Sequence, residues 1–316
     1  MKELLQSLAQ SSLYKSLLAK VQAQNSTTVG GLAGASLSAV VANLYTHTHR
    51  PLLVLLPDKE ESAYVLNDLE TLVGEQRVLF FPDSYRRPYQ IEDTDNANAL
   101  LRAEVLHQLS HSTKPLIVVS YPEALFEKVI TRKQLEQNTL KITKGDSLTL
   151  EFLNEVLFSY QFNRTDFVTE PGEFSVRGGI VDIFSFSNNE PYRIEFFGNE
   201  VESIRTFDVE SQLSTAQLSQ IIIIPNVENK ESDEVRQSFL EYISPQTLFI
   251  AKDIASLGQK IDKLFAKATD IYQKLANEVK RTAPEELYCQ TEDLLAQANR
   301  LQSIHIGISQ PELTFL

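Results

Sequence analysis

The sequence predicts an α/β protein in which parallel-sheet sections flank a small inserted α+β domain. Three observations predict this class. Residues 26–130 alternate short β-rich runs with helical stretches, residues 131–224 are dominated by strands, and residues 225–316 return to helix, strand and helix. Alternating strands and helices are typical of βαβ units. We therefore expect a parallel sheet in each flanking section.

The individual elements follow from local patterns in chain order. The first 24 residues place leucines at helical spacing among Gln, Ser and Lys, which indicates an amphipathic helix. In the first section the predicted strands are 51–56, 78–81 and 116–120, and the predicted helices are 59–72 and 96–110. In the middle section the strands are 139–143, 173–176, 192–197 and 221–224, with one helix at 147–160. In the last section we predict a helix at 232–242, a strand at 247–251 and helical stretches within 253–300.

Composition narrows the possible functions. The 316 residues suffice for two or three domains, and the formal charge of −13 disfavours unaided binding to a phosphate backbone. No apolar run is long enough to cross a bilayer, so no membrane partner is expected. The single cysteine, Cys289, excludes a disulfide framework within the chain and fits a reducing compartment. These features predict a cytoplasmic location.

The most informative segment is Glu170 to Asp208, because its strand parity predicts a recognition surface. In residues 192–197 alternate side chains point to opposite faces, so Arg193, Glu195 and Phe197 share the face away from the core. The preceding strand adds Arg177 just before a Gly-Gly bend. An aromatic ring beside arginines is the usual composition of a protein-binding hot spot. The alternative is a solvated sheet face with one stray phenylalanine.

A glycine-rich turn at residues 27–44 resembles a phosphate loop that has lost its chemistry. A working loop needs the pattern G-x-x-x-x-G-K-[ST], in which the lysine neutralises phosphate charge. Aligning Gly34 and Ser36 with the end of this pattern leaves Gly31 inside the loop and puts Ala35 at the lysine position. Alanine cannot counter the charge of a transferring phosphoryl group. The alternative is a simple helix start, and both interpretations predict no catalysis here.

Two other groups carry weaker signals. The histidine pairs His47/His49 and His107/His111 have no third ligand nearby in sequence, so no metal site is expected. One basic-aromatic group suits stacking and phosphate contact, although its expected role in this acidic chain is packing or a domain contact. It comprises Tyr85, Arg86, Arg87 and Tyr89.

Long stretches of the chain resemble a known family. GEFSVRGGIVDIFSF followed by PYRIEFFGNEVESIRTFD, together with GLAGAS near residue 31 and LFFPDSYRRPYQ near residue 79, is similar to the N-terminal region of bacterial transcription-repair coupling factors, which is related to the repair protein UvrB. The resemblance implies two degenerate motor-like subdomains derived from P-loop folds and an inserted UvrA-binding domain. The implied boundaries are 26–130 for the first subdomain, 1–25 with 225–316 for the second, and 131–224 for the insert.

The resemblance also implies a function and a partner. The family's binding residues map onto Arg177, Arg193 and Phe197, the positions that strand parity selects, and Glu195 lies among them. The chain is therefore expected to be a monomeric, UvrB-mimicking adaptor that recruits UvrA to stalled RNA polymerase. No cofactor is expected, because ATP and magnesium would act in a motor absent from this sequence.

Departures from UvrB limit what is carried over. UvrB keeps its phosphate-loop lysine, so its ATPase activity is not expected here, and there is no room for its tyrosine-rich hairpin, so damage engagement is not expected either. Because the sequence ends at Leu316, we expect a fragment that reaches RNA polymerase and DNA only through missing parts and binds UvrA constitutively. The alternative function is a nucleotide- or DNA-binding motor subdomain acting in damage handling.

Overall fold

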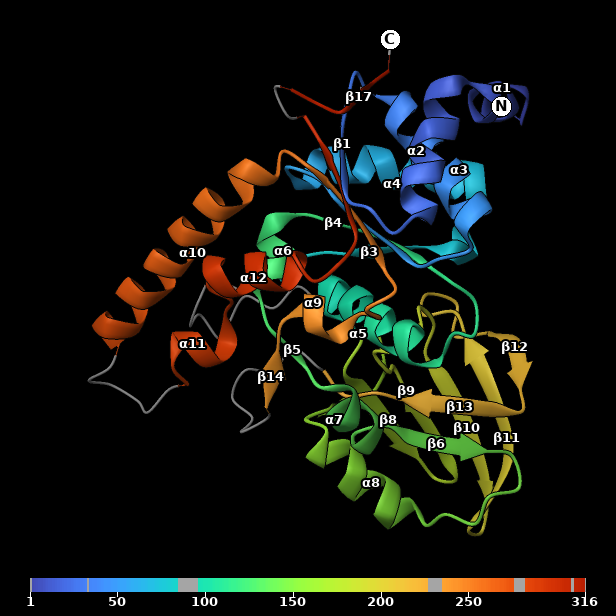
Figure 1. The fold of residues 1–316 in the computed structure, drawn as a ribbon. Helices are drawn as coiled ribbons and strands as arrows, with labels where there is room; N and C mark the ends of the chain where they lie inside the picture. The colour runs from blue at the N-terminus through green and yellow to red at the C-terminus, as the bar shows by residue number, and fades with distance from the viewer. Residues whose placement is uncertain are drawn as a thin grey trace. The chain divides into compact units, whose positions relative to one another are not determined.

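The computed structural model divides the chain into two compact units (Figure 1). The parallel-sheet unit comprises Met1–Gln90, Leu109–Val129 and Val235–Leu316, and the inserted unit comprises Ile91–Gln108 and Ile130–Glu234. The residues that the structure describes are 2–32, 34–84, 96–226, 235–275, 282–307 and 310–315.

The parallel-sheet unit is built on a seven-stranded sheet with the order β17-β1-β16-β15-β2-β4-β3. All of its strand pairs are parallel. The apolar runs LLVL and IVVS form the fully buried strands β2 and β4, as parallel strands covered on both faces require. The strands are β1 Thr27–Gly30, β2 Leu52–Leu55, β3 Val78–Phe81, β4 Ile117–Ser120, β15 Leu248–Lys252, β16 Ser303–Ile306 and β17 Leu313–Thr314.

Strands from both flanking sections of the sequence join in this one sheet. Strand β15 pairs with β2 on one side, with Ile250 opposite Val54, and with β16 on the other. The predicted α/β class is thus confirmed, with its parallel strands held in a common sheet. Strands β1, β16 and β17 were not predicted, because their short runs contain Thr, Ser, His and Gly.

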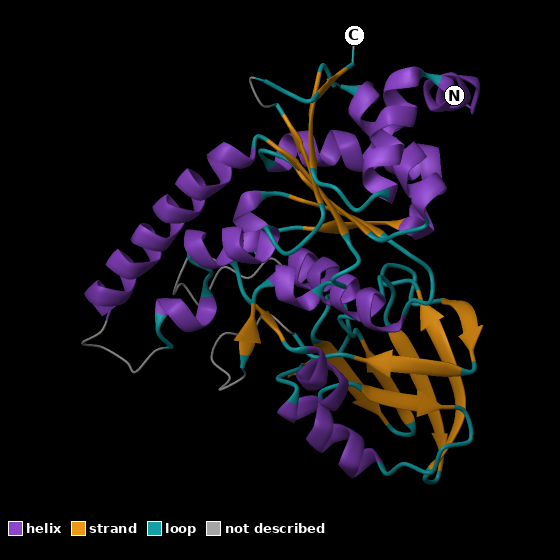
Figure 2. Ribbon diagram, in the orientation of Figure 1, coloured by secondary structure: helices purple, strands orange, loops and turns teal. Residues whose placement is uncertain are grey.

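Helices lie on both sides of the seven-stranded sheet (Figure 2). Buried side chains of α2, α3 and α4 share a core with β1, β2, β4, β15 and β16, whereas α10 packs against α6 and α12. The helices are α1 Lys2–Gln10, α2 Ser12–Gln22, α3 Ala35–Thr48, α4 Lys59–Val73, the 3-10 turn η1 Glu75–Arg77, α6 Pro122–Phe126, α9 Phe239–Tyr242, α10 Ile254–Leu275, α11 Pro284–Leu287 and α12 Thr291–Ala298. Two further two-stranded sheets are formed by β5 Val129–Ile130 with β14 Arg236–Gln237, and by β6 Leu140–Thr143 with β13 Gln220–Ile223. The segment 236–237 lies inside a predicted helix.

The N-terminal segment forms two helices where the sequence predicted one. Ser11 has extended backbone, and its hydroxyl accepts a hydrogen bond from the amide of Tyr14 at 3.2 Å, which caps α2 and ends α1. Tyr14, Leu17 and Val21 then point into the core. Helix α2 contacts both α3 and β17.

The inserted unit contains a six-stranded sheet with the order β12-β11-β10-β9-β8-β7. Its pairs are antiparallel except β7 with β8. Helix α8 contributes the buried side chains of Leu153 and Leu157. The ring of its Phe158 packs edge-on against Phe174 of β8, with the two ring centres 5.3 Å apart. The elements are α7 Arg132–Gln137, β6 Leu140–Thr143, α8 Leu150–Ser159, β7 Asn163–Arg164, β8 Glu173–Arg177, β9 Ile180–Ile183, β10 Tyr192–Phe197, β11 Glu200–Phe207, β12 Ser214–Leu218 and β13 Gln220–Ile223, while α5 Asn96–His111 runs across the unit boundary.

The Gly-Gly bend between β8 and β9 has two separate physical causes. Gly178 has φ +61°, a backbone conformation that favours glycine. A Cβ atom on Gly179 would lie 2.9 Å from the carbonyl oxygen of Phe196, whose amide donates to the Gly179 carbonyl. The glycines therefore fix the position of β10 beside the bend.

The glycine loop between β1 and α3 has the strand–loop–helix order of a phosphate loop, but the C-terminal segment lies against it. Gly31 has φ +76°, and a Cβ atom built on it would lie 1.6 Å from the carbonyl oxygen of Phe315. The Phe315 amide in turn donates to the Gly30 carbonyl at 2.9 Å. Helix α3 begins at Ala35, after Gly34 and without a side-chain cap. A backbone oxygen thus lies against the loop at Gly31.

The substitution Gly31→Ala should therefore displace the C-terminal strand. The matched control is Gly34→Ala, because Gly34 also has positive φ but no atom lies within 4 Å of its added Cβ. Backbone strain of about 1–3 kcal/mol is expected in both variants. The discriminating measurement is hydrogen exchange of the Phe315 amide relative to amides of β2. Faster relative exchange is expected only in Gly31→Ala, and equal exchange in the two variants would contradict the close contact.

Candidate protein-binding surface

The side of the six-stranded sheet that carries the predicted site residues is called the outer face here. Along β10 the side chains of Tyr192, Ile194 and Phe196 are buried, whereas those between them are at least partly exposed. The predicted strand parity is thus confirmed. Cross-strand register defines the rest of the face. On strands β8 to β11 the outer face includes Ser175, Arg177, Ile180, Asp182, Arg193, Glu195, Phe197, Glu200, Ser203 and Arg205.

A buried carboxylate, Asp182, holds the two arginines predicted from the sequence. Arg193 lies directly opposite it on β10 and donates from Nε at 2.7 Å and from Nη2 at 2.9 Å, one bond to each carboxylate oxygen. Arg177 donates from Nη2 to the same carboxylate. The Asp182 side chain is only 1% exposed. Two charge-assisted contacts therefore offset the cost of burying this charge.

Arg193 makes most of its contacts within the protein itself. Beyond Asp182, its Nη1 donates to the carbonyl of Gln212 at 3.1 Å, and its guanidinium lies 4.3 Å from the centre of the Phe207 ring. The hydrogen bond with Asp182 raises the pKa of Arg193 above its usual value, so the group stays charged. Its side chain is 15% exposed, against 40% for Arg177. Arg177 is thus the more accessible of the two cations.

Glu195 forms a second ion pair on the outer face. It accepts a hydrogen bond from the Ser203 hydroxyl at 2.7 Å and pairs with Arg205. The Ser203 hydrogen bond, together with the charge of Arg205, holds the pKa of Glu195 below its usual range. The carboxylate is therefore ionised at neutral pH and balances Arg205.

Phe197 is the most exposed of the predicted site residues. Its ring lies at the end of β10, just before the turn into β11, and 78% of its surface is accessible. The structure thus brings Arg177 and Arg193 together on one carboxylate, places Glu195 in a separate ion pair and leaves Phe197 projecting from the same face.

Two residues in contact with Arg177 were not among the predicted site residues. Asp182 is a charged residue inside the apolar strand IVDI, and strand parity could have placed it opposite Arg193. Phe167 precedes β8 in a loop, and the Arg177 guanidinium lies 5.2 Å from the centre of its ring. No periodic pattern marks a loop residue, so the sequence offered no comparable signal for Phe167.

The other sequence predictions concern metal ligands, membrane spans and one basic-aromatic group. No group of three metal-ligating side chains is found in the part of the chain that the structure describes. Within those same ranges, no helix has the length and apolar character needed to cross a membrane. The basic-aromatic group, which comprises Tyr85, Arg86, Arg87 and Tyr89, lies outside the described residues.

Comparison with known proteins assigns the outer face to a recognised module. Residues 140–228 match the UvrB interaction domain. This range runs from β6 to just beyond β13 and includes every residue of the outer face.

The similarity extends beyond this module to parts of longer repair proteins. The transcription-repair-coupling factor of Bacillus subtilis is 29% identical over 198 residues, which cover 62% of this chain and 17% of that protein. The corresponding protein of Myxococcus xanthus is 32% identical over 213 residues, 65% of this chain and 18% of that protein. UvrABC system protein B of Thermotoga neapolitana is 25% identical over 230 residues, 69% of this chain and 35% of that protein.

These matches confirm the resemblance that the sequence indicated, to the N-terminal UvrB-like region of transcription-repair-coupling factors. They support a UvrB-like role in repair. The chain spans less than a fifth of the first two coupling factors and about a third of UvrABC system protein B.

Replacing the buried carboxylate of Asp182 should destabilise the inserted unit more than replacing the partly exposed carboxylate of Glu195. Asp182→Asn leaves the largely buried Arg193 without its counter-charge, and breaking such a pair costs about 3 kcal/mol or more of unfolding free energy. The control Glu195→Gln breaks a pair that is about one-third exposed on each side, for which about 1 kcal/mol or less is expected. Urea unfolding monitored by circular dichroism measures both. Equal small losses would show that Asp182 does not organise the arginines.

Proposed function

We propose that this chain is a UvrB-mimicking adaptor that recruits the repair protein UvrA to stalled RNA polymerase. In this proposal the outer face of the inserted unit is the UvrA-binding surface. The observation that carries the proposal is the Phe197 ring, which is 78% exposed on the same sheet face as two arginines that a buried carboxylate holds in place, inside a UvrB interaction domain.

The composition and rigidity of the outer face favour protein binding. Arginines and aromatic rings dominate the energy of protein interfaces, and a ring on a strand loses little conformational entropy when it binds. Arg177 remains 40% exposed and keeps a fixed direction through its bond to Asp182. A solvated sheet face needs neither an exposed ring nor a buried carboxylate beneath its cations, so these features favour the binding interpretation.

The relatives' names connect the chain to a particular partner. They are a transcription-repair-coupling factor and protein B of the UvrABC system, and UvrA is the component that a UvrB-type module would contact. The chain's own charge of −13 disfavours direct binding to DNA. We therefore assign contacts with DNA and RNA polymerase to the part of the coupling factors that this chain does not match.

The glycine loop supports the proposal that this chain does not hydrolyse ATP. Ala35 stands where a phosphate loop needs lysine, and the Phe315 carbonyl oxygen lies against Gly31. An oxygen at that position would repel a phosphate, and no ammonium group compensates within the loop.

Loss of the Phe197 ring should weaken binding to UvrA. Truncating a central aromatic of a hot spot costs about 2 kcal/mol or more, which is about a thirtyfold rise in Kd. Phe197→Ala is preferable to an Arg193 variant, because loss of Arg193 also removes two hydrogen bonds to the buried Asp182 and leaves it only its contact with Arg177. The control is Tyr64→Ala, since Tyr64 is a 68% exposed ring on α4 of the parallel-sheet unit. Isothermal titration with purified UvrA measures both, and unchanged affinity in Phe197→Ala would contradict the proposal.

A titration with a fluorescent ATP analogue should show no saturable binding at micromolar concentrations. The expectation follows from the missing lysine and the oxygen beside the loop. A known phosphate-loop protein serves as the positive control. Micromolar affinity would instead favour the alternative, a nucleotide-binding motor subdomain.

A further inference from the structure

Four phenylalanines are exposed among the described residues of the inserted unit, and they divide into two pairs. Phe152 and Phe158 belong to α8, whose Phe158 contacts Phe174 of the face opposite the outer one. Phe197 lies on the outer face. Phe167 lies in the loop before β8 and is 61% exposed. A single exposed ring needs no explanation, but an exposed ring that lies next to an arginine of a candidate binding surface could extend that surface.

The loop that carries Phe167 is fixed by hydrogen bonds before the ring and by a buried residue after it. The Thr165 amide donates to the Phe174 carbonyl at 2.9 Å, and the Ser175 hydroxyl donates to the Asp166 carbonyl at 3.0 Å. The Thr165 hydroxyl donates to the carbonyl of Phe167 itself at 3.0 Å. The next residue, Val168, is fully buried. The Phe167 ring is therefore held in the exposed position before any partner arrives.

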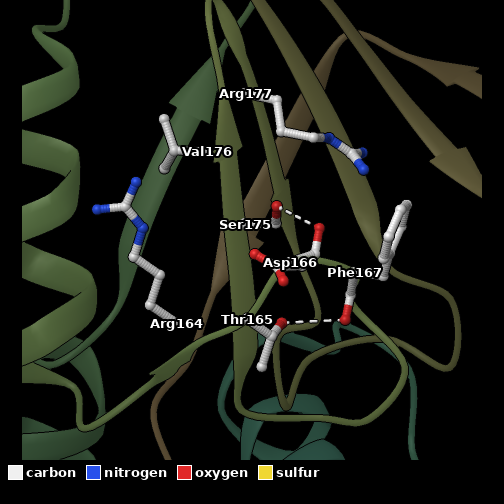
Figure 3. A pocket seen from close by; sticks show the side chains of 7 residues that line it. All are labelled: Arg164, Thr165, Asp166, Phe167, Ser175, Val176 and Arg177. Atoms are coloured by element: carbon white, nitrogen blue, oxygen red, sulfur yellow. Dashed lines mark hydrogen bonds between the residues drawn. The ribbon is translucent and has the colours of Figure 1, made fainter.

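Arg177 links this ring to the outer face. Its guanidinium lies 5.2 Å from the centre of the Phe167 ring while its Nη2 donates to Asp182. Both side chains line a hollow formed by β8 and the preceding loop. Figure 3 shows Arg177 and Phe167 on the same side of β8, with Arg164 and Val176 on the other. Phe167 thus continues the surface on which Arg177 lies.

Arg177 also keeps N–H groups that can donate hydrogen bonds to a partner. A guanidinium carries five N–H donors, and the structure gives Arg177 one hydrogen bond, to Asp182, among the described residues. Arg193, in contrast, donates to Asp182 and to two acceptors of Gln212. An incoming carboxylate would therefore meet Arg177, beside an exposed ring whose apolar surface is free for packing.

We infer that Phe167 is a second aromatic anchor of the proposed UvrA-docking surface, and that the docking segment of UvrA places a carboxylate on Arg177 and an apolar side chain on Phe167. This inference rests on the proposed function. It extends the surface from the sheet onto the loop between β7 and β8, a region that strand parity does not reach. Arg177 is then the shared element between the loop and the sheet.

The test compares Kd values for purified UvrA by isothermal titration. Phe167→Ala should raise Kd about tenfold or more, as loss of a hot-spot ring does. The matched control Phe152→Ala removes a 46% exposed ring of the same type from α8 and should change Kd less than twofold. If Phe167→Ala unfolds, Phe167→Leu keeps apolar bulk without the ring and should still raise Kd severalfold.

Two further measurements address Arg177. The effects of Phe167→Ala and Arg177→Gln should be less than multiplicative in the double variant, because each substitution removes the same contact between them. The affinity of Arg177→Gln should also fall less steeply with added salt than that of the parent, because its charged contact is gone. Multiplicative effects and an unchanged salt dependence would overturn the role given to Arg177.

The outcomes separate the inference from the proposed function. If Phe197→Ala weakens binding while Phe167→Ala and Phe167→Leu both bind like the parent, the inference is wrong and the proposed function stands. If none of these variants weakens binding, the proposed function itself is wrong. An equal loss in the control Phe152→Ala would also overturn the inference, because the effect would then not be specific to the outer face.

Discussion

The arrangement of the outer face depends on the burial of one carboxylate. Asp182 is nearly inaccessible, and burial of a lone charge would be costly. Asp182 lies on β9, and it is paired with two arginines on the strands on either side, β8 and β10. The contacts that allow the carboxylate to be buried therefore also fix the directions of both guanidinium groups. Arg193 is covered in the process, whereas Arg177 stays accessible. The buried carboxylate of Asp182 therefore binds both arginines, but only Arg177 remains accessible to a partner.

The two units use their glycines in contrasting ways. In the inserted unit Gly178 and Gly179 form a bend that brings β10 close to the end of β8 and keeps the outer face compact. In the parallel-sheet unit Gly31 allows the C-terminal segment to approach the loop that in a nucleotide-binding relative would hold phosphate. The first arrangement positions two strands of the outer face, and the second allows two distant segments of the chain to pack together.

The fold class and the outer-face residues of β10 could be predicted from the sequence, because both depend on regular periodicity. The alternation in β10 was sufficient to separate Tyr192 and Ile194 from Arg193 and Phe197. The pairing of β15 with β2 was not predictable, because strand pairing between Leu248 and Leu52, which are 196 residues apart, leaves no local signal. Phe167 was also missed, because its position depends on loop hydrogen bonds to β8 rather than on any repeat. Regular elements are thus readable from sequence, and long-range pairing and loop geometry are not.

The alternation in β10 also constrains how this module can change over generations. Core residues and outer-face residues occupy adjacent positions of the same strand, so inserting or deleting one residue would exchange the two sets. Such an event would bury Arg193 and Glu195 and expose Tyr192 and Ile194. Within β10, the outer face can therefore change only by substitution at every second position, whereas changes in length are confined to turns and loops.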